Sequence, residues 1–217
     1  MDDERRALSR LVKLHLEGLT AFGVTAVPVM KGPDDRALGP PMDREPAGSL
    51  LERLEKLARE IERCRRCPLY RTRTHVVISD GSPSAKLVFV GEAPGREEDL
   101  QGKPFVGAAG ALLTKMIEAI GMKREEVYIC NVLKDRPPAN RTPLPEEVEA
   151  CLPFLQEQLA ILQPTVICTL GAVATKALLG PHGSITKIRG SVRDYQGILL
   201  VPTFHPAYLL RNPPAKK

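Results

Sequence analysis

The feature that most constrains the fold is a set of four short runs of nearly continuous apolar residues. They occupy residues 87–90, 127–132, 166–170 and 198–201. Their β-branched, unbroken apolar character is typical of strands in a parallel sheet that is covered on both faces. The segments between them predict helices over residues 108–120, 145–162 and 171–180. This alternation predicts an α/β protein, a three-layer α/β/α fold around a central, mainly parallel four-stranded sheet.

The N-terminal residues follow a different pattern. Residues 4–22 have the leucine and valine spacing of an amphipathic helix, and residues 23–47 are rich in Pro, Gly and Asp, as in a linker. Ser49 is placed to cap a second helix. We therefore expect an N-terminal extension over residues 1–47 and one domain over residues 48–217.

The bulk composition narrows the class of protein. With 217 residues, 43% of them hydrophobic and only 4% aromatic, the chain can bury one mainly aliphatic core. The N-terminus is charged, and no apolar run approaches the roughly 20 residues that a membrane span needs. We therefore expect a cytoplasmic protein without a membrane partner.

Positive charge gathers in two segments. Residues 63–73 contain five arginines and no acidic residue, and residues 186–217 contain six basic residues against Asp194 alone. Clustered basic segments are typical of proteins that bind the phosphate backbone of nucleic acids. A solvated basic surface has the same composition, so charge alone leaves both interpretations open.

A loop rich in Gly and Pro follows the first apolar run and indicates a ligand site. It reads GEAPG over residues 91–95, and PFVG follows over residues 104–107. Open α/β folds bind ligands at the carboxyl edge of the sheet, where such a loop lies. The carboxylate of Glu92 and the ring of Phe105 at this edge suggest a pocket for a flat, polar ring, although the same residues could serve the turn alone.

The cysteines bear on metal chemistry. Disulfides are uncommon in the cytoplasm, so the pair formed by Cys64 and Cys67 with two residues between them indicates a metal or redox site. The spacing leaves a zinc site, an iron–sulfur cluster and a pair without metal all open. Cys151, near the start of a predicted helix, could reach a shared site, whereas Cys168 in a predicted strand is expected to be a buried apolar residue.

Five ordered blocks together resemble the family 4 uracil-DNA glycosylases, the iron–sulfur, thermostable-type branch of that superfamily. The resemblance covers about residues 50–213. Its blocks are GEAPG at 91–95, GKPFVG at 102–107, NVLK at 131–134, RPPANR at 136–141 and HPAYLLR at 205–211. It implies a DNA repair enzyme that flips uracil out of DNA and hydrolyses its N-glycosidic bond, leaving an abasic site.

The resemblance also implies roles for residues around the base. Phe105 would stack on the flipped uracil, and Asn131 would donate to its O4 and accept from its N3–H. His205 would donate to uracil O2 as negative charge develops on the departing base. Gly91 and Ala93 would lie beside the base as part of its binding site.

Two glutamates are candidates for the remaining chemistry. Glu92 stands in the motif where the family 1 enzymes carry the aspartate that holds the attacking water, and Glu98 follows soon after. A carboxylate near the sugar could position water and stabilise an oxocarbenium-like cation. Glu98 could instead exclude the 5-methyl group of thymine from the binding site.

The last block predicts the contact with duplex DNA. Tyr208, Leu209 and Leu210 form an apolar tip that precedes Arg211. We expect Leu209 or Leu210 to enter the gap left by the flipped base and Arg211 to contact the backbone. The alternative is that these leucines pack on the sheet.

The cluster ligands depart from the family pattern. Family 4 members carry four cysteines that hold a [4Fe–4S] cluster; here Cys64, Cys67 and Cys151 match, but Asp135 stands at the third ligand position. We expect these four residues to bind the cluster, with the carboxylate as a harder and more labile ligand. Ligation by Cys130, a three-iron cluster and the absence of a cluster remain the alternatives.

Three classes of function therefore compete. The resemblance favours a monomeric enzyme acting on uracil in single- or double-stranded DNA. The second is a catalytically weakened module that binds uracil or abasic DNA, and the third is a zinc-bearing nucleic-acid or redox protein built on the cysteine pair. The combination of Glu92, Phe105, Asn131 and His205 argues against the second class.

Overall fold

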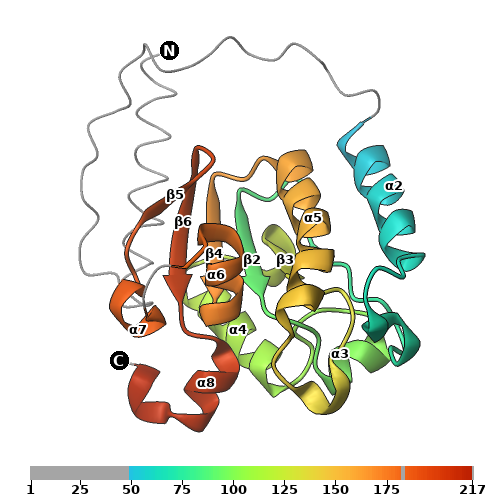
Figure 1. The fold of residues 1–217 in the computed structure, drawn as a ribbon. Coiled ribbons are helices and arrows are strands. Elements are labelled where there is room, and N and C mark those ends of the chain that lie inside the picture. The colour runs from blue at the N-terminus through green and yellow to red at the C-terminus, as the bar shows by residue number, and fades with distance from the viewer. Residues whose placement is uncertain (1–48, 182–183, 217) are drawn as a thin grey trace.

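A six-stranded sheet runs through the centre of the protein (Figure 1). The structure is a computed structural model that describes residues 49–181 and 184–216, so the predicted helix over 4–22 and the predicted linker over 23–47 lie outside the described residues. The strands follow the order β1-β3-β2-β4-β6-β5 across the sheet. Their bounds are β1 Asp80–Gly81, β2 Leu87–Gly91, β3 Tyr128–Asn131, β4 Val166–Leu170, β5 Arg193–Tyr195 and β6 Ile198–Thr203.

The four predicted strands form the parallel centre of this sheet. β3, β2, β4 and β6 pair in parallel, while β1 and β5 add to the two edges in antiparallel orientation. β1 has two residues and β5 has three, and neither carries an apolar run that a sequence pattern could reveal. The predicted α/β class with a mainly parallel centre is confirmed.

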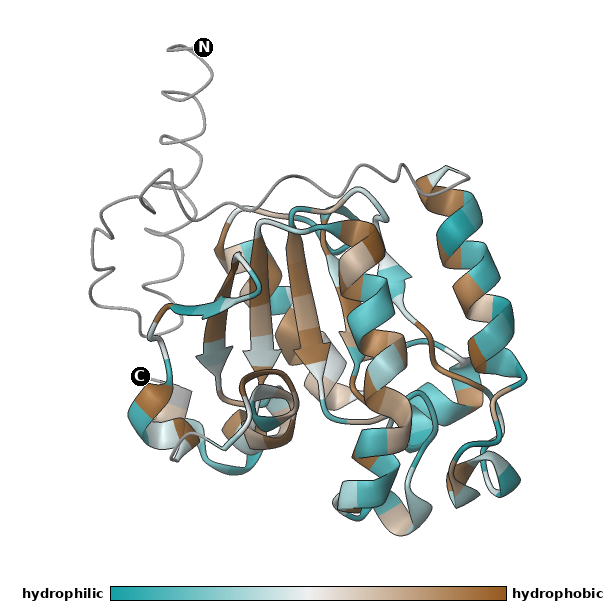
Figure 2. Ribbon diagram, turned by 45° about the horizontal axis from the view of Figure 1, so that its top comes forward, coloured by the Kyte–Doolittle hydropathy of each residue, from teal (hydrophilic) through white to brown (hydrophobic). Residues whose placement is uncertain are grey.

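Alternation along the strands builds a core on each face of the sheet. On β2, Val88 and Val90 pack into the cluster that contains the buried leucines of helix α5, while Leu87 and Phe89 pack into the cluster that contains those of α4. Figure 2 shows largely brown, apolar strands between helices of mixed character. β2 is buried along its whole length because helices cover both faces, which confirms the three layers.

The helices surround this sheet as the pattern predicts. The three predicted helices over 108–120, 145–162 and 171–180 are found within one residue at either end. The bounds are α2 Leu50–Glu62, α3 Arg96–Gln101, α4 Ala108–Ala119, α5 Pro145–Leu162, α6 Ala172–Leu179, α7 Ile185–Ile188 and α8 Pro206–Arg211, with short 3₁₀ turns between some of them. Within the described part of the chain, no helix is long and apolar enough to cross a membrane.

Helix α2 begins at the predicted cap. The Ser49 hydroxyl accepts from the Glu52 amide at 3.3 Å, and the Glu52 carboxylate accepts from the Ser49 amide at 2.7 Å. This reciprocal arrangement satisfies two amides that the first turn would otherwise leave without partners. The buried side chains Leu57 and Ile61 then pack α2 against the cluster that holds α5.

The four parallel strands end at the same edge of the sheet, and their loops carry the predicted site residues. β2 ends at Gly91, directly opposite Asn131 at the end of β3. His205 follows the end of β6 by two residues and caps α8. Groups that are far apart in the sequence are therefore brought to one edge, as parallel topology requires.

One ion pair between a buried glutamate and a partly exposed arginine holds the long connection between β3 and α5. Glu147, in the first turn of α5, is 1% exposed and accepts from Arg141 at 2.6 and 2.9 Å. It also accepts from the Leu144 amide at 2.8 Å. The hydrogen bond from Arg141 holds the pKa of Glu147 below its usual value. The pair fastens a loop that forms one wall of the candidate site.

Replacing Glu147 by Gln should destabilise the fold and lower its urea midpoint, because a neutral amide weakens the contact with the partly exposed Arg141 guanidinium. Since the folded-state pKa of Glu147 is depressed, the stabilisation is present above the pKa of unfolded glutamate and is lost as the pH falls through the folded-state value. Urea unfolding at neutral pH measures this difference. The matched control is Glu146→Gln at the exposed neighbouring position, and equal unfolding midpoints for the two variants would contradict the expectation.

Candidate active site and cysteine cavity

A cavity of about 410 Å³ opens at the carboxyl edge of the sheet. It is lined by seven of the predicted site residues: Glu92, Ala93, Glu98, Phe105, Asn131, His205 and Arg211. Gly91 lies against the same wall, because a Cβ at this position would collide with the Asn131 side chain and the Phe105 ring. The sequence blocks at 91–95, 102–107, 131–134 and 205–211 therefore meet in one pocket.

The Phe105 ring is fixed in the wall of this cavity. Its backbone has φ 54°, in the left-handed region that bulky residues rarely adopt. The ring stacks on that of His205, with centroids 5.6 Å apart and planes inclined by 30°. Gly110 makes this conformation possible, since a Cβ there would overlap the Phe105 carbonyl group. Local strain thus holds an aromatic face at the site.

Asn131 contributes a buried acceptor without a partner. Its side chain lines the cavity and is 2% exposed, and its Oδ1 is the one buried side-chain N or O atom without a hydrogen bond among the described residues. Leaving a buried polar atom unpaired costs about 1–3 kcal/mol of folding stability, so its presence in a folded protein needs a physical explanation. A donor on a ligand in the cavity would satisfy this oxygen.

His205 has its tautomer set by the cap that it makes. Its Nδ1 accepts from the Ala207 amide at 3.1 Å, so a neutral ring carries its proton on Nε2. Burial, helped by the charge of Arg211, lowers the pKa of His205 to about 4. The ring is therefore neutral at pH 7 and offers Nε2–H as a hydrogen-bond donor.

The two candidate glutamates differ in what binds them. Glu98 Oε1 accepts from the Val106 amide at 3.1 Å and the Gly107 amide at 3.2 Å, so it holds the loop that follows Phe105. The carboxylate of Glu92 has no hydrogen-bond partner among the described residues, and burial raises its pKa. Glu92 is therefore the freer of the two carboxylates for chemistry at the cavity.

The residues of helix α8 that the sequence predicts to contact DNA differ in their exposure to solvent. Leu209 is 8% exposed and packs in the interior, whereas Tyr208 and Leu210 are 39% and 41% exposed. The Tyr208 ring rests on that of Phe204, with centroids 4.8 Å apart. Of the two leucines expected to enter the DNA, only Leu210 is exposed, and Leu209 could not leave the interior without unpacking α8. Arg211 lines the cavity itself.

One wall of the cavity had no role assigned from the sequence. It consists of Pro137, Asn140, Arg141 and Thr142. Asn140 Oδ1 accepts from Arg136 Nε at 2.6 Å, and Asn140 has a positive φ. In the sequence, the RPPANR block at 136–141 marks this wall. No single residue of the block had a predicted role, so the sequence did not indicate which of its side chains face a ligand.

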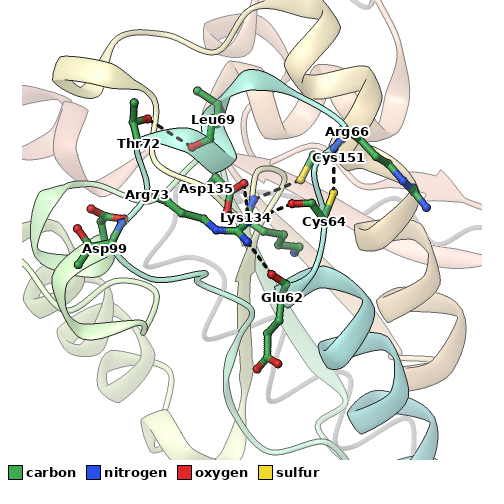
Figure 3. A network of polar contacts seen from close by, with 11 residues as sticks. Glu62, Cys64, Arg66, Leu69, Thr72, Arg73, Asp99, Lys134, Asp135 and Cys151 are labelled. Atoms are coloured by element: carbon green, nitrogen blue, oxygen red, sulfur yellow. Dashed lines mark hydrogen bonds and ion pairs between the residues drawn. The ribbon is translucent and has the colours of Figure 1, made fainter.

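Four residues proposed as cluster ligands line a second, smaller cavity, part of which Figure 3 shows. Cys64 and Cys67 follow α2, Asp135 follows β3, and Cys151 lies on α5. The predicted ligand set is therefore brought to one place from three parts of the chain.

Backbone amides point at two of the sulfur atoms in this cavity. The Arg66 amide lies 3.5 Å from Cys64 Sγ, and the Lys134 amide lies 3.3 Å from Cys151 Sγ. Such N–H···S bonds favour thiolates and help to set the properties of iron–sulfur clusters. Burial raises the pKa of Cys151 to about 11, although the amide and the charge of Lys134 oppose this rise, so the thiol needs further positive charge to ionise.

Arg73 holds Asp135 at the edge of the cysteine cavity (Figure 3). Its Nη1 lies 3.0 Å from both carboxylate oxygens of Asp135, and its Nη2 donates to the Glu62 carbonyl at 2.6 Å. Nη1 also reaches the Cys64 carbonyl at 3.4 Å. Burial raises the pKa of Asp135, and Arg73 opposes that rise. One guanidinium thus ties the end of α2 to the loop that follows β3.

Lys134 joins the two cavities through the interior. It is 2% exposed, and its Nζ donates to the Asn131 carbonyl at 2.7 Å and to Gln158 Oε1 at 2.6 Å. No carboxylate pairs with it among the described residues. Burial lowers the pKa of Lys134, and ionised thiolates at Cys130 and Cys151 would oppose that shift by favouring the charged amine.

The remaining cysteines lie apart from the cysteine cavity. Cys130 is fully buried in the core and does not line the cavity. Cys168 is buried among apolar residues as predicted, and burial raises its pKa to about 12. Neither thiol is placed to complete the ligand set without movement of the strand that carries it.

The side chains that line this cavity are of types that can bind an iron–sulfur cluster. Three thiols and a carboxylate share one cavity, with N–H donors to sulfur and cationic side chains close by. Across residues 49–181 and 184–216, no group of three or more His, Cys, Asp and Glu side chains has an arrangement suited to a single metal ion.

Comparison with known proteins identifies the family. The model of the uracil DNA glycosylase superfamily matches residues 78–217. The chain belongs to this superfamily. A type-4 uracil-DNA glycosylase of Thermotoga maritima is 51% identical over 163 residues, which cover 74% of this chain and 85% of the relative. That of Archaeoglobus fulgidus is 46% identical over 171 residues, covering 75% and 86%.

A second branch of the superfamily is more distant. A type-5 uracil-DNA glycosylase of Pyrobaculum aerophilum is 30% identical over 149 residues, covering 61% of this chain and 66% of the relative. The greater identity and coverage with the type-4 proteins place the chain in the type-4 branch, which confirms the resemblance read from the five sequence blocks.

The protonation of His205 gives a direct test of the site. Nitrogen NMR should show its ring as the neutral Nε2–H tautomer from about pH 8 down to about pH 5, well below the usual histidine pKa of about 6.5. Because the folded-state pKa is depressed, stability should fall as the pH drops through about 6.5. Arg211→Gln should raise the pKa, since Arg211 opposes protonation. Protonation of the wild-type ring near pH 6.5 would contradict this geometry.

Proposed function

We propose that this chain is a DNA repair enzyme, a uracil-DNA glycosylase that binds a flipped uracil in the 410 Å³ cavity and hydrolyses its N-glycosidic bond. The observation that carries the proposal is the buried, unpartnered Oδ1 of Asn131. Uracil N3–H is the donor that this oxygen lacks, and the amide Nδ2 can donate to uracil O4. Cytosine presents an acceptor and a donor in the opposite order, so the same amide rejects it. The type-4 relatives support this assignment.

Phe105 and His205 supply the rest of base recognition and part of the catalysis. The Phe105 ring offers the stacking face that replaces a neighbouring base of the duplex. The neutral His205 ring directs Nε2–H toward uracil O2, where negative charge develops as the glycosidic bond breaks. A donor that is already fixed by the cap to Ala207 needs no reorganisation at that moment.

Glu92 is the residue that we assign to the attacking water. The C1′–N1 bond breaks with its electron pair going to uracil, and the water oxygen bonds to C1′. The proton released by water passes to the Glu92 carboxylate, and the products are the uracil anion, which later takes a proton at N1 from solvent, and an abasic site. A partly buried carboxylate beside the sugar also stabilises the developing cation, and Glu98 keeps the loop of Phe105 in place.

Helix α8 is assigned to the DNA side of the cavity. Flipping a base costs a few kcal/mol of unstacking, which an inserted apolar side chain helps to offset. Leu210 is the exposed apolar residue of α8, and Tyr208 lies beside it on the same short helix. Arg211 lines the cavity and is suited to a phosphate of the flipped nucleotide.

The cysteine cavity is assigned to a [4Fe–4S] cluster. Cys64, Cys67, Cys151 and Asp135 would hold it, with the carboxylate as the more labile ligand. Bound there, the cluster would supply negative charge and cross-links between chain segments. The position of Lys134 supports this assignment, because burial lowers the pKa of its amine and anionic sulfur ligands beside it would favour the charged form. A brown colour would distinguish this assignment from a zinc site, whose complexes are colourless.

The alternative of a weakened binding module is less well supported. Such a module would keep the reading amide of Asn131 but would not need a neutral, capped His205 beside a partly buried Glu92. The monomeric state, the cytoplasmic location and the domain boundary near residue 48 stay predictions from the sequence.

Changing Asn131 to Asp tests base recognition. A carboxylate accepts from N3–H but repels uracil O4, so single-turnover excision of uracil should fall by at least about 100-fold and discrimination against cytosine should decrease. The matched control is Asn140→Asp, since Asn140 lines the same cavity but bonds Arg136. We expect a much smaller loss in that variant. Unchanged uracil excision and unchanged discrimination in Asn131→Asp would refute the assignment.

Changing Asp135 to Cys tests the ligand set. A fourth thiolate should keep the iron content per chain equal or raise it, and the iron should persist longer in air. Because the change also removes the carboxylate partner of Arg73, the readouts are iron, sulfide and visible absorption rather than melting temperature. Cys151→Ala should lose iron, whereas Cys130→Ala should retain it. Iron content and air sensitivity that do not respond to Asp135→Cys would exclude Asp135 as a ligand.

A further inference from the structure

The arginine segment, residues 63–73, presents four of its five arginines to solvent. Arg63, Arg65, Arg66 and Arg71 are exposed, and no acidic residue occurs between Arg63 and Ser79. None of the four forms an ion pair with a described residue. Arginines gathered in this way repel one another unless an anionic partner neutralises them. Arg66 lines the cluster cavity, whereas Arg65 and Arg71 line neither that cavity nor the base-recognition cavity.

The fifth arginine has a different role from the others. Arg73 is half-buried and is bound to Asp135 and to the carbonyl of Glu62. It therefore anchors the segment to the loop that follows β3. The other four arginines are exposed at the surface, where the Arg66 guanidinium lies over the Phe154 ring, 4.6 Å from its centroid.

Two of the exposed arginines are ordered by one aromatic ring. The guanidinium carbons of Arg65 and Arg71 lie 5.7 and 5.6 Å from the centroid of the Tyr70 ring. Arg71 Nε also donates to the Tyr70 hydroxyl at 3.3 Å. Placing two long side chains on one ring reduces the conformational entropy that each would lose on binding a ligand. The pair is thus partly preorganised.

The C-terminal end of the arginine segment is joined to two segments that form walls of the uracil cavity. Its Arg73 binds Asp135, two residues before Pro137 in the cavity wall. The residues that follow it bind α3: the Thr74 amide donates to Asp99 Oδ1 at 2.8 Å, and the His75 ring bonds the Asp99 carbonyl at 3.0 Å. α3 also carries Glu98 of the cavity wall. Figure 1 shows this segment and α8 at the end of the molecule where the parallel strands end.

We infer that Arg65 and Arg71, on the shared Tyr70 ring, form a phosphate-binding surface for the DNA that flanks the flipped nucleotide. Arginine is suited to phosphate by its planar fork of donors and its permanent charge. With Arg211 at the cavity, this surface would give DNA a second contact outside the base pocket. The inference rests on the proposed function for the identity of its partner, a DNA backbone.

The salt dependence of DNA binding tests this surface. The probe is a duplex with a tetrahydrofuran abasic-site analogue, titrated by fluorescence anisotropy at several salt concentrations. Arg65→Gln and Arg71→Gln should each weaken binding by roughly fivefold at about 0.1 M salt and reduce the slope of log K against log salt by about 0.9 per lost contact. The matched control is Arg193→Gln, an exposed arginine on the edge strand β5, which should change neither quantity.

The outcomes separate this inference from the proposed function. Single-turnover excision at saturating enzyme should stay within about twofold of wild type in both variants, since neither arginine lines the cavity. If excision is intact but the salt slopes equal those of wild type and Arg193→Gln, the surface is not a DNA contact. If the wild-type protein excises no uracil, the proposed function fails, while the salt slopes still report on the surface.

Discussion

The parallel pairing of β2 with β3 is the constraint on which the site depends. Their register places Gly91 opposite Asn131, and the missing side chain of Gly91 leaves room for both the Asn131 amide and the Phe105 ring. Parallel strands leave the sheet at the same edge, so His205 after β6 joins this group although it lies far along the chain. A shift of one residue in this register would turn the Asn131 side chain to the opposite face of the sheet and remove it from the cavity.

The site holds groups in states that folding alone would not favour. Asn131 Oδ1 is buried without a partner, Phe105 has a left-handed backbone, and His205 is neutral because burial and Arg211 oppose its protonation. The unpaired oxygen and the left-handed backbone cost stability, and the apolar clusters on both faces of the sheet must offset that cost. Strained and unpaired groups are found mainly at functional sites, where a bound ligand supplies the missing contacts. Because these groups meet at one cavity, we regard that cavity as a binding site.

An ion pair between Arg73 and Asp135 holds one corner of the cysteine cavity together. With Asp135 at the expected ligand position, Arg73 binds the carboxylate and reaches the carbonyls of Glu62 and Cys64. The end of α2 is thereby joined to the loop after β3 by an ion pair that needs no metal. The same loop continues into the cavity wall at Pro137, so the two sites share a support, and Lys134 adds a second link through the Asn131 carbonyl.

The sequence by itself determined the central strands, the three long helices between them and most of the cavity residues, because apolar periodicity and ordered motif blocks are local signals. It could not show the edge strands β1 and β5, which are too short and polar to leave a pattern. Nor could it decide that Leu209 is buried while Leu210 is exposed, since that depends on how α8 packs. The partner of Asp135 was equally hidden, because Arg73 lies 62 residues away in the chain and only the tertiary fold brings the two side chains within 3.0 Å.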